Sequence, residues 1–216
     1  IGVIFHIDKN TAEQTVDYSF PIQIHGNIPY GNLTYGGNGK FYGMTSIGGV
    51  YNYGIIFEWD SATNVITKKI DFDNLNGATP RGSLTHFNGK FYGMTTDGGT
   101  YGSGVIFEWD PITNIYIKKF DFDHTNSGSH PYGSLTINEG KFYGMTSTGG
   151  VNSQGVIFEW DPASNIFTKK IDWLNLSMGA NPKGSLTFYN DKFYGMTEFG
   201  GSYQDGVIFE WHPATN

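Results

Sequence analysis

The sequence is organised around Lys90-Phe91-Tyr92-Gly93-Met94-Thr95, which is followed by Gly98-Gly99 and then by Gly104-Val105-Ile106-Phe107-Glu108-Trp109-Asp110. The first motif, Lys-Phe-Tyr-Gly-Met-Thr, begins at Lys40, Lys90, Lys141 and Lys192, at spacings of 50, 51 and 51 residues. The second motif returns around Phe5, Phe57, Phe107, Phe158 and Phe209. A fixed period near fifty residues indicates a repeat protein, in which one supersecondary unit buries its core by stacking on copies of itself.

Each repeat contains signals for four strands. In one copy, residues 83–87 and 90–95 flank Asn88-Gly89, the strongest two-residue hairpin signal, and residues 105–109 and 115–122 flank the turn at Asp110-Pro111-Ile112-Thr113-Asn114. We call these strands a, b, c and d. Four antiparallel strands at this period fit a propeller blade better than a coil of a solenoid.

The predicted fold is therefore an all-β propeller of four-stranded antiparallel blades, kelch-like, with about four blades plus an extra strand. We expect one domain over residues 1–216: strands c and d in 1–30, full repeats in 31–80, 81–131 and 132–182, and strands a, b and c in 183–216. These segments hold seventeen strands, which is not a multiple of four. Because open sheet edges promote aggregation, we expect the chain to be part of a longer array. Its start at Ile1, inside a repeat motif, also points to a processed or excerpted chain.

Composition agrees with this architecture and narrows the classes of partner. The 31 glycines, 17% aromatic residues and 15% charged residues describe many tight turns between apolar strands. A net charge of −7, with no basic cluster longer than a Lys-Lys pair, argues against nucleic acid as a partner. No apolar run approaches the roughly 20 residues that cross a bilayer. The absence of cysteine excludes disulfides and thiolate metal sites.

Strand c predicts a sheet that is buried on both faces. Val105, Phe107 and Trp109 alternate with Ile106 and Glu108, as a sheet between two neighbouring blades requires. Gly93 in the middle of strand b predicts close packing by a large aromatic side chain. We expect that side chain to be Phe107 or Trp109 in a neighbouring copy.

These motifs resemble two known families. The order Pro-x-Gly-Ser-Leu-Thr, Gly-Lys-Phe-Tyr-Gly-Met-Thr, Gly-Gly and Val-Ile-Phe-Glu-Trp-Asp-Pro-x-x-Asn resembles kelch repeats. It is more similar to the bacterial GloVer-type tandem repeat, whose motifs match Asn76-Gly77-Ala78-Thr79-Pro80, Phe91-Tyr92-Gly93-Met94-Thr95 and Gly104-Val105-Ile106-Phe107, with Met94 and Val105 where that family has Thr. The resemblance implies a propeller-like array on secreted or cell-surface bacterial proteins, hence an extracellular location, and it supplies no catalytic residues.

The glutamates of strand c are the first candidates for chemistry. Glu58, Glu108, Glu159 and Glu210 recur in every copy, whereas a single active site needs asymmetry. We expect them to pair with a lysine of strand d such as Lys118, or with backbone NH groups. His6 takes this place in the first copy.

Other ligand-bearing motifs predict no metal and no cofactor. Asp71 with Asp73, and Asp121 with Asp123, faintly resemble calcium loops, but their spacing is wrong for an EF-hand and solvated strand ends are favoured. His124 and His130 are the only close pair of histidines, too few ligands for zinc. Neither a phosphate-binding Gly-x-x-x-x-Gly-Lys-Ser/Thr motif nor a nucleophile elbow is present.

The loops that vary between copies are the candidate recognition surface. If strand a runs up and strand b runs down, the b–c and d–a loops emerge on the same face of the disc. Rigid aromatic residues and arginine on such loops are typical of recognition surfaces. The candidate ligand-binding residues are Tyr30, Tyr51, Tyr53, Arg81, Tyr101, Tyr132, Lys183, Phe199 and Tyr203.

The functional prediction is a non-enzymatic binding or adhesion module that recognises a carbohydrate or a protein through this loop face. Two alternatives stay open: a structural spacer in a large surface adhesin, and a propeller enzyme that acts on glycans. Further repeats of the same chain, or a partner chain, are also possible partners.

Overall fold

Five antiparallel sheets follow one another along the chain in the computed structural model, which describes residues 2–20 and 26–215. The strands of the first two sheets are β1 (Val3–Ile7), β2 (Gln14–Ser19), β3 (Thr34–Gly37), β4 (Lys40–Thr45), β5 (Ile55–Asp60) and β6 (Val65–Asp71). Those of the next two are β7 (Thr85–Phe87), β8 (Lys90–Thr95), β9 (Val105–Trp109), β10 (Tyr116–Asp121), β11 (Thr136–Asn138), β12 (Lys141–Thr146), β13 (Val156–Asp161) and β14 (Ile166–Asp172). The last sheet holds β15 (Thr187–Tyr189), β16 (Lys192–Met196) and β17 (Ile208–Trp211), after a single 3-10 turn at Leu176–Met178.

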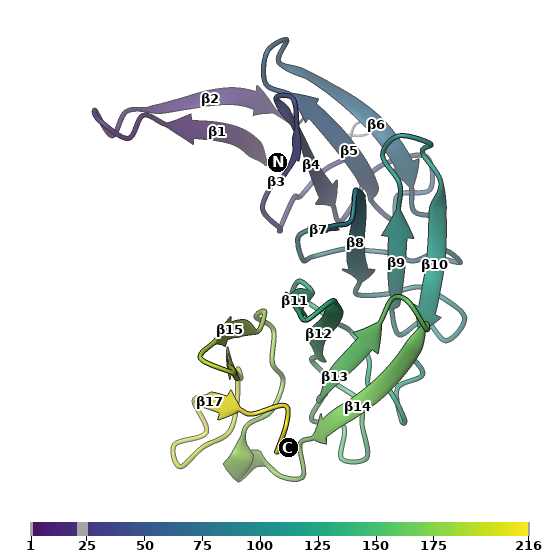
Figure 1. Cartoon of the computed structure of the whole chain (residues 1–216), viewed down its shortest axis with the longest axis vertical. Coiled ribbons are helices and arrows are strands. Elements are labelled where there is room, and N and C mark those ends of the chain that lie inside the picture. The colour runs from purple at the N-terminus through teal and green to yellow at the C-terminus, as the bar shows by residue number, and fades with distance from the viewer. Residues whose placement is uncertain (1, 21–25, 216) are drawn as a thin grey trace.

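Each sheet is a propeller blade, and we number the blades 1 to 5 in chain order. Blade 1 is β1–β2, blades 2 to 4 have four strands each, and blade 5 is β15–β17. The blades stand side by side around an open arc, with β7 nearest its centre and β10 at its rim in blade 3 (Figure 1). The all-β propeller prediction and its four-stranded blades are thus confirmed, and the described residues contain the seventeen strands expected.

The turns adopt the conformations that their sequences favour. Asn88 and Gly89 have φ of 50° and 76°, the left-handed pair that a two-residue hairpin needs between β7 and β8. Asn114, in the turn between β9 and β10, also lies in the left-handed region with φ of 56°. Asparagine and glycine are the residues that reach this region at least cost, so the turns fix the strand register.

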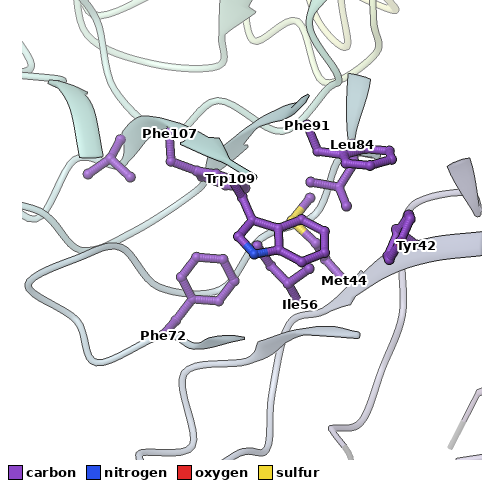
Figure 2. Close-up of a cluster of buried hydrophobic side chains, with 9 residues drawn as sticks. Tyr42, Met44, Ile56, Phe72, Leu84, Phe91, Phe107 and Trp109 are labelled. Atoms are coloured by element: carbon purple, nitrogen blue, oxygen red, sulfur yellow. The ribbon is translucent and has the colours of Figure 1, made fainter. Parts of the chain in front are cut away.

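The core lies between blades. In the interface of blades 2 and 3, Tyr42 and Met44 of β4 are buried against Leu84, Phe91 and Trp109 (Figure 2). The Tyr42 ring centroid lies 4.7 Å from that of Phe91 and 5.2 Å from that of Trp109. Such contacts add aromatic pairing to the hydrophobic gain of burying each ring. Two further clusters, one in each of the next two interfaces, repeat this arrangement.

The packing of Gly93 corrects one expectation. A Cβ placed on Gly93 would lie 2.5 Å from Cζ of Phe107, and Phe107 is its cross-strand partner in the same blade. The aromatic side chain over this glycine therefore belongs to the same sheet and not to a neighbouring copy. Gly43 with Phe57, and Gly144 with Phe158, repeat the contact.

Hydrogen bonds also join each blade to the next. Near the centre of the arc, Ser83 N donates to Ser134 Oγ at 2.8 Å, and Thr85 Oγ1 donates to Leu135 O at 2.7 Å. At the rim, Asn114 Nδ2 donates to Lys69 O of the preceding blade at 3.2 Å. Both ends of a blade are therefore held to its neighbour by polar contacts that recur from copy to copy.

The glutamates of strand c pair with lysines of strand d as predicted, Lys69 with Glu58 at 3.2 Å and Lys170 with Glu159 at 3.3 Å. A lysine of strand b, which was not predicted, lies closer still. Glu108 accepts hydrogen bonds from Lys90 of strand b at 2.6 Å and from the Tyr92 hydroxyl at 3.0 Å. The strand d lysine nearest to it is Lys119, at 3.9 Å, because Lys118 points to Asp121 instead. Burial raises the pKa of Glu108, but the hydrogen bonds from Lys90 and Tyr92 outweigh it and bring that pKa below its ordinary value.

Candidate recognition surface on the loop face

The b–c and d–a loops form one hydrogen-bonded layer, which we call the loop face. Ala78, in the loop between blades 2 and 3, pairs with Asp97 of the next b–c loop through two backbone hydrogen bonds of 2.8 and 3.0 Å. Its neighbour Thr79 donates from its backbone N to Tyr53 O of the preceding b–c loop at 2.9 Å. The same pairing returns at Ser129 with Thr148 and at Ala180 with Phe199. As the strand order required, the two sets of loops lie on the same face.

Four predicted residues come together in a single row, which we call the inner row: Tyr30, Arg81, Tyr132 and Lys183. Each is the middle residue of a Pro-x-Gly segment just before strand a, the innermost strand of its blade. The Arg81 guanidinium carbon lies 4.9 Å from the Tyr30 ring centroid and 4.8 Å from that of Tyr132. Tyr132 also has a cation on its other side in the row, because Lys183 Nζ lies 5.6 Å from the Tyr132 ring centroid. Cations and aromatic rings therefore alternate along four successive blades.

The row is possible because the strand a segments approach very closely. A Cβ on Gly82, next to Arg81, would lie 2.3 Å from Gly133 O in the following blade. Any side chain here would push the blades apart. Glycine thus brings Arg81 and Tyr132 within stacking distance although 51 positions separate them in the sequence.

The inner row ends beside a cavity. Lys183 Nζ forms an ion pair of 2.7 Å with Glu198, and Glu198 N donates to Asn181 O at 3.2 Å. Asn181 and Phe199 are both part of the wall of a cavity of about 410 Å³ between blades 4 and 5. The remaining wall residues are Thr148, Ser153, Gln154, Leu176, Ala180 and Gln204. Amide and hydroxyl groups next to an aromatic ring give this cavity both hydrogen-bonding and stacking capacity.

The other predicted residues are exposed on the b–c loops but do not join the inner row. Tyr51, Tyr101 and Tyr203 are 57%, 63% and 88% exposed, and Tyr53 contributes its backbone carbonyl to the loop layer. Among the described residues, none of these four side chains makes a ring or cation contact with the row. Phe199, which was also predicted, lies in the cavity wall.

Sequence reasoning missed the polar partners at the end of the row. Glu198, Gln154 and Gln204 were not selected, although Gln154 and Gln204 stand in b–c loops already singled out for their variability. The only signal in the sequence was that Glu198 and Lys183 carry charges of opposite sign and could therefore form an ion pair. The cavity itself depends on the course of two loops, which no motif specifies.

Aspartates and histidines on this face have structural partners. Asp121 Oδ1 accepts from Thr100 N at 2.7 Å and binds Lys118, so it holds a b–c loop and is not the solvated strand end that we expected. His130 Nδ1 lies 3.0 Å from Thr148 Oγ1, and its Nε2 lies 3.5 Å from Asp97. Within residues 2–20 and 26–215, no group of three or more His, Cys, Asp or Glu side chains is arranged to hold a metal ion. Nor does any helix in these ranges have the length and apolar character to cross a membrane.

Comparison with known proteins identifies the repeat. The Gloeobacter/Verrucomicrobia repeat matches residues 1–209, nearly the whole chain. The chain belongs to this family. Membership confirms the GloVer-type resemblance that the Phe-Tyr-Gly-Met-Thr and Gly-Gly motifs indicated. No curated protein sequence matches this member of the Gloeobacter/Verrucomicrobia repeat family.

Solved structures share the fold at low sequence identity. A chain in the crystal structure of a nidogen/laminin complex is 13% identical with a TM-score of 0.63, over 99% of this chain and 73% of that one. TolB from Acinetobacter baumannii is 14% identical with a TM-score of 0.55, over 98% of this chain and 49% of TolB. These likenesses support the propeller-like architecture of this repeat protein and nothing finer.

Proposed function

We propose that this chain is a non-enzymatic binding module that recognises a carbohydrate through the inner row and the adjoining cavity. The observation that carries the proposal is the Arg81 guanidinium stacked between the rings of Tyr30 and Tyr132. Tyrosine and arginine offer large contact areas with little loss of side-chain entropy, and they dominate binding energy at recognition surfaces. A row of them on a rigid scaffold is a preorganised site.

The cavity favours a carbohydrate over a protein segment. Its amides and a hydroxyl, from Gln154, Asn181, Gln204 and Ser153, match the many hydroxyl groups of a sugar, and Phe199 offers a ring for stacking. A protein ligand remains the alternative outcome of the experiment below. A surface location is part of the proposal, and only the family resemblance supports it.

The charges of the row favour a sugar that carries a carboxylate or sulfate group. Lys183 is neutralised by Glu198, but Arg81 has no ion-pair partner within the described residues, and its Nε is buried without a hydrogen-bond partner there. A guanidinium held between two rings is suited to bidentate contacts with an anionic group. We therefore expect binding to weaken as salt concentration rises.

A glycan array followed by titration calorimetry tests the proposal. We expect acidic glycans to bind, and Arg81→Ala to weaken the best ligand by about 30-fold, which corresponds to about 2 kcal/mol. Ile112→Ala, in an exposed c–d turn on the opposite face, is the matched control and should leave affinity unchanged. Binding that Arg81→Ala does not affect would contradict the assigned site.

Two other outcomes separate the alternative functions. A chain that binds neither glycans nor surface proteins would be a spacer. Release of reducing ends from a bound glycan would make it an enzyme. Either result would replace the proposal of a non-enzymatic carbohydrate-binding module.

A further inference from the structure

The first blade interface is an incomplete copy of the three that follow. Between blades 2 and 3, Ile56 and Phe72 pack with Tyr42 and Met44 against the next blade. Between blades 1 and 2, Ile4 and Phe20 take the places of Ile56 and Phe72, but the cluster contains no Tyr or Met from a strand b. Among the described residues, β1 pairs only with β2, so its inner edge is unpaired.

Without a Tyr and a Met from a strand b in blade 1, the face of blade 2 that lies toward blade 1 is only partly covered. Leu33 and Phe41 are only partly buried, whereas their counterparts Leu84 and Phe91 are 3% and 1% exposed. A cavity of about 280 Å³ lies at this position, with Phe5 of β1 on one side and Leu33 and Gly43 on the other. In the later interfaces the equivalent positions are covered by Tyr and Met of strand b.

The backbone at the start of β1 is already placed for a complete blade. A Cβ on Gly2 would lie 2.3 Å from Pro29 Cδ, as a Cβ on Gly104 would lie 2.9 Å from Pro131 Cδ in the next interface. The same Cβ on Gly104 would also lie 2.3 Å from Thr95 O of its own strand b, whereas the three atoms nearest to a Cβ on Gly2 all belong to Pro29. Blade 1 thus keeps the spacing of the repeat on its outer half.

We propose that the edge of β1 and this cavity are a docking site for one further a–b hairpin of the same repeat. Its second strand would pair with β1, as β8 pairs with β9, and its Tyr and Met would fill the cavity. Such strand addition combines main-chain hydrogen bonds for affinity with pockets for alternate side chains. Phe5, which is 48% exposed, selects a glycine opposite it, as Phe107 does with Gly93.

A second copy of this chain is a poorer occupant. The Tyr and Met of β4, β8 and β12 are buried in their own interfaces. Met196 of β16 is 61% exposed, but the outer edge of β16 is already paired with β17. Pairing of β16 with β1 of another copy would first require loss of β17.

A graft that keeps the repeat in register tests the proposal. A second copy of residues 130–154, which precede Gly155, is fused before Gly2, because Gly2 and Gly155 hold the same position in the repeat. We expect the melting temperature to rise by about 5 °C or more through burial of two large side chains, and amide exchange in β1 to slow at least tenfold. The same graft with Tyr143→Ser and Met145→Ser in the added copy keeps the length but should lose most of the gain.

Two results would overturn the proposal. One is an equal effect of both grafts on melting temperature and on exchange in β1. The other is a stable dimer of the unmodified chain in sedimentation that the graft dissociates, since a second copy would then be the occupant. If the grafted chain fails to fold, the added segment is supplied as a separate peptide. Selective shifts of Leu33 and Phe41 resonances would support docking, and unchanged spectra at saturating peptide would contradict it.

Discussion

Gly93 lies directly beneath the ring of Phe107, its cross-strand partner, with 2.5 Å between the Phe107 Cζ atom and the place that a Cβ would occupy. Phe107 is fully buried and packs on Tyr116 with 5.1 Å between ring centroids, so it cannot move aside. Gly93→Val should therefore destabilise the chain by about 3 kcal/mol through overpacking. Urea unfolding measures the change.

Gly102→Asn is the matched control for this substitution. Nothing lies within 4 Å of a Cβ at Gly102, and its φ of 69° is one that asparagine tolerates. Its effect should stay within about 0.5 kcal/mol. Equal losses for the two variants would show that the ring of Phe107 does not select glycine at position 93.

Asn114 connects two blades from a single turn. Its Oδ1 accepts a hydrogen bond from Trp109 Nε1 at 3.1 Å, and its Nδ2 donates to Lys69 O of the preceding blade at 3.2 Å. Asn114→Gly keeps the left-handed backbone but removes both bonds, so we expect a loss of about 2 kcal/mol in urea unfolding. Asn88→Gly, in a hairpin with φ of 50°, is the control, because it changes the same residue type in the same conformation. A smaller loss at Asn114 than at Asn88 would contradict this role.

The sequence predicted the blades better than the ends of their strands. The expected bounds of strands b and c match β8 and β9, because side chains on both faces of these strands are buried and the apolar residues therefore mark the whole strand. Strand a is shorter than the expected residues 83–87 and begins at Thr85. The reason is that Ser83 N bonds to Ser134 Oγ of the next blade instead of a strand in its own sheet. An interaction between repeats is invisible in a pattern read within one repeat.

The candidate site was predictable in part. Tyr30, Arg81, Tyr132 and Lys183 hold the same repeat position in successive copies, so stacking of blades necessarily brings them into a row. The short distances between them depend on the glycine that follows each residue. In the sequence this glycine is visible only as part of the repeated Pro-x-Gly motif. The cavity at Phe199 could not be predicted, because it lies beside the one copy of the d–a loop that forms a 3-10 turn, at Leu176–Met178, among the described residues, and no sequence motif specifies that turn.

Acid should weaken the blades through the strand c glutamates. The folded-state pKa of Glu108 lies below its ordinary value of 4.5: burial raises it, but hydrogen bonds from Lys90 and Tyr92 lower it further. A carboxylate with a depressed pKa contributes stability that is fully present above the unfolded-state pKa and is lost as pH falls through the folded-state pKa. We expect the urea midpoint to be flat above about pH 5 and to fall below about pH 4.5. The decline should be shallower in a Glu58→Gln, Glu108→Gln, Glu159→Gln variant, and an identical slope would refute the assignment.

The inner row should carry more binding energy than the outer tyrosines. The sequence alone suggested equal roles for Tyr51, Tyr101 and Tyr203 and for the residues before strand a, but only the latter are held by neighbouring rings and cations. Restriction of Arg81 by two rings lowers the entropy lost on binding, whereas Tyr203, at 88% exposure, must be immobilised by the ligand.

Against an acidic glycan found by the array, we therefore expect Arg81→Ala with Tyr132→Ala to cost at least 2 kcal/mol in calorimetry. Replacement of the three outer tyrosines together should cost less than about 1 kcal/mol, and neither variant should lower the melting temperature by more than a few degrees, since these loop side chains hold no blade core. The reverse order of losses would move the site from the inner row to the b–c loops.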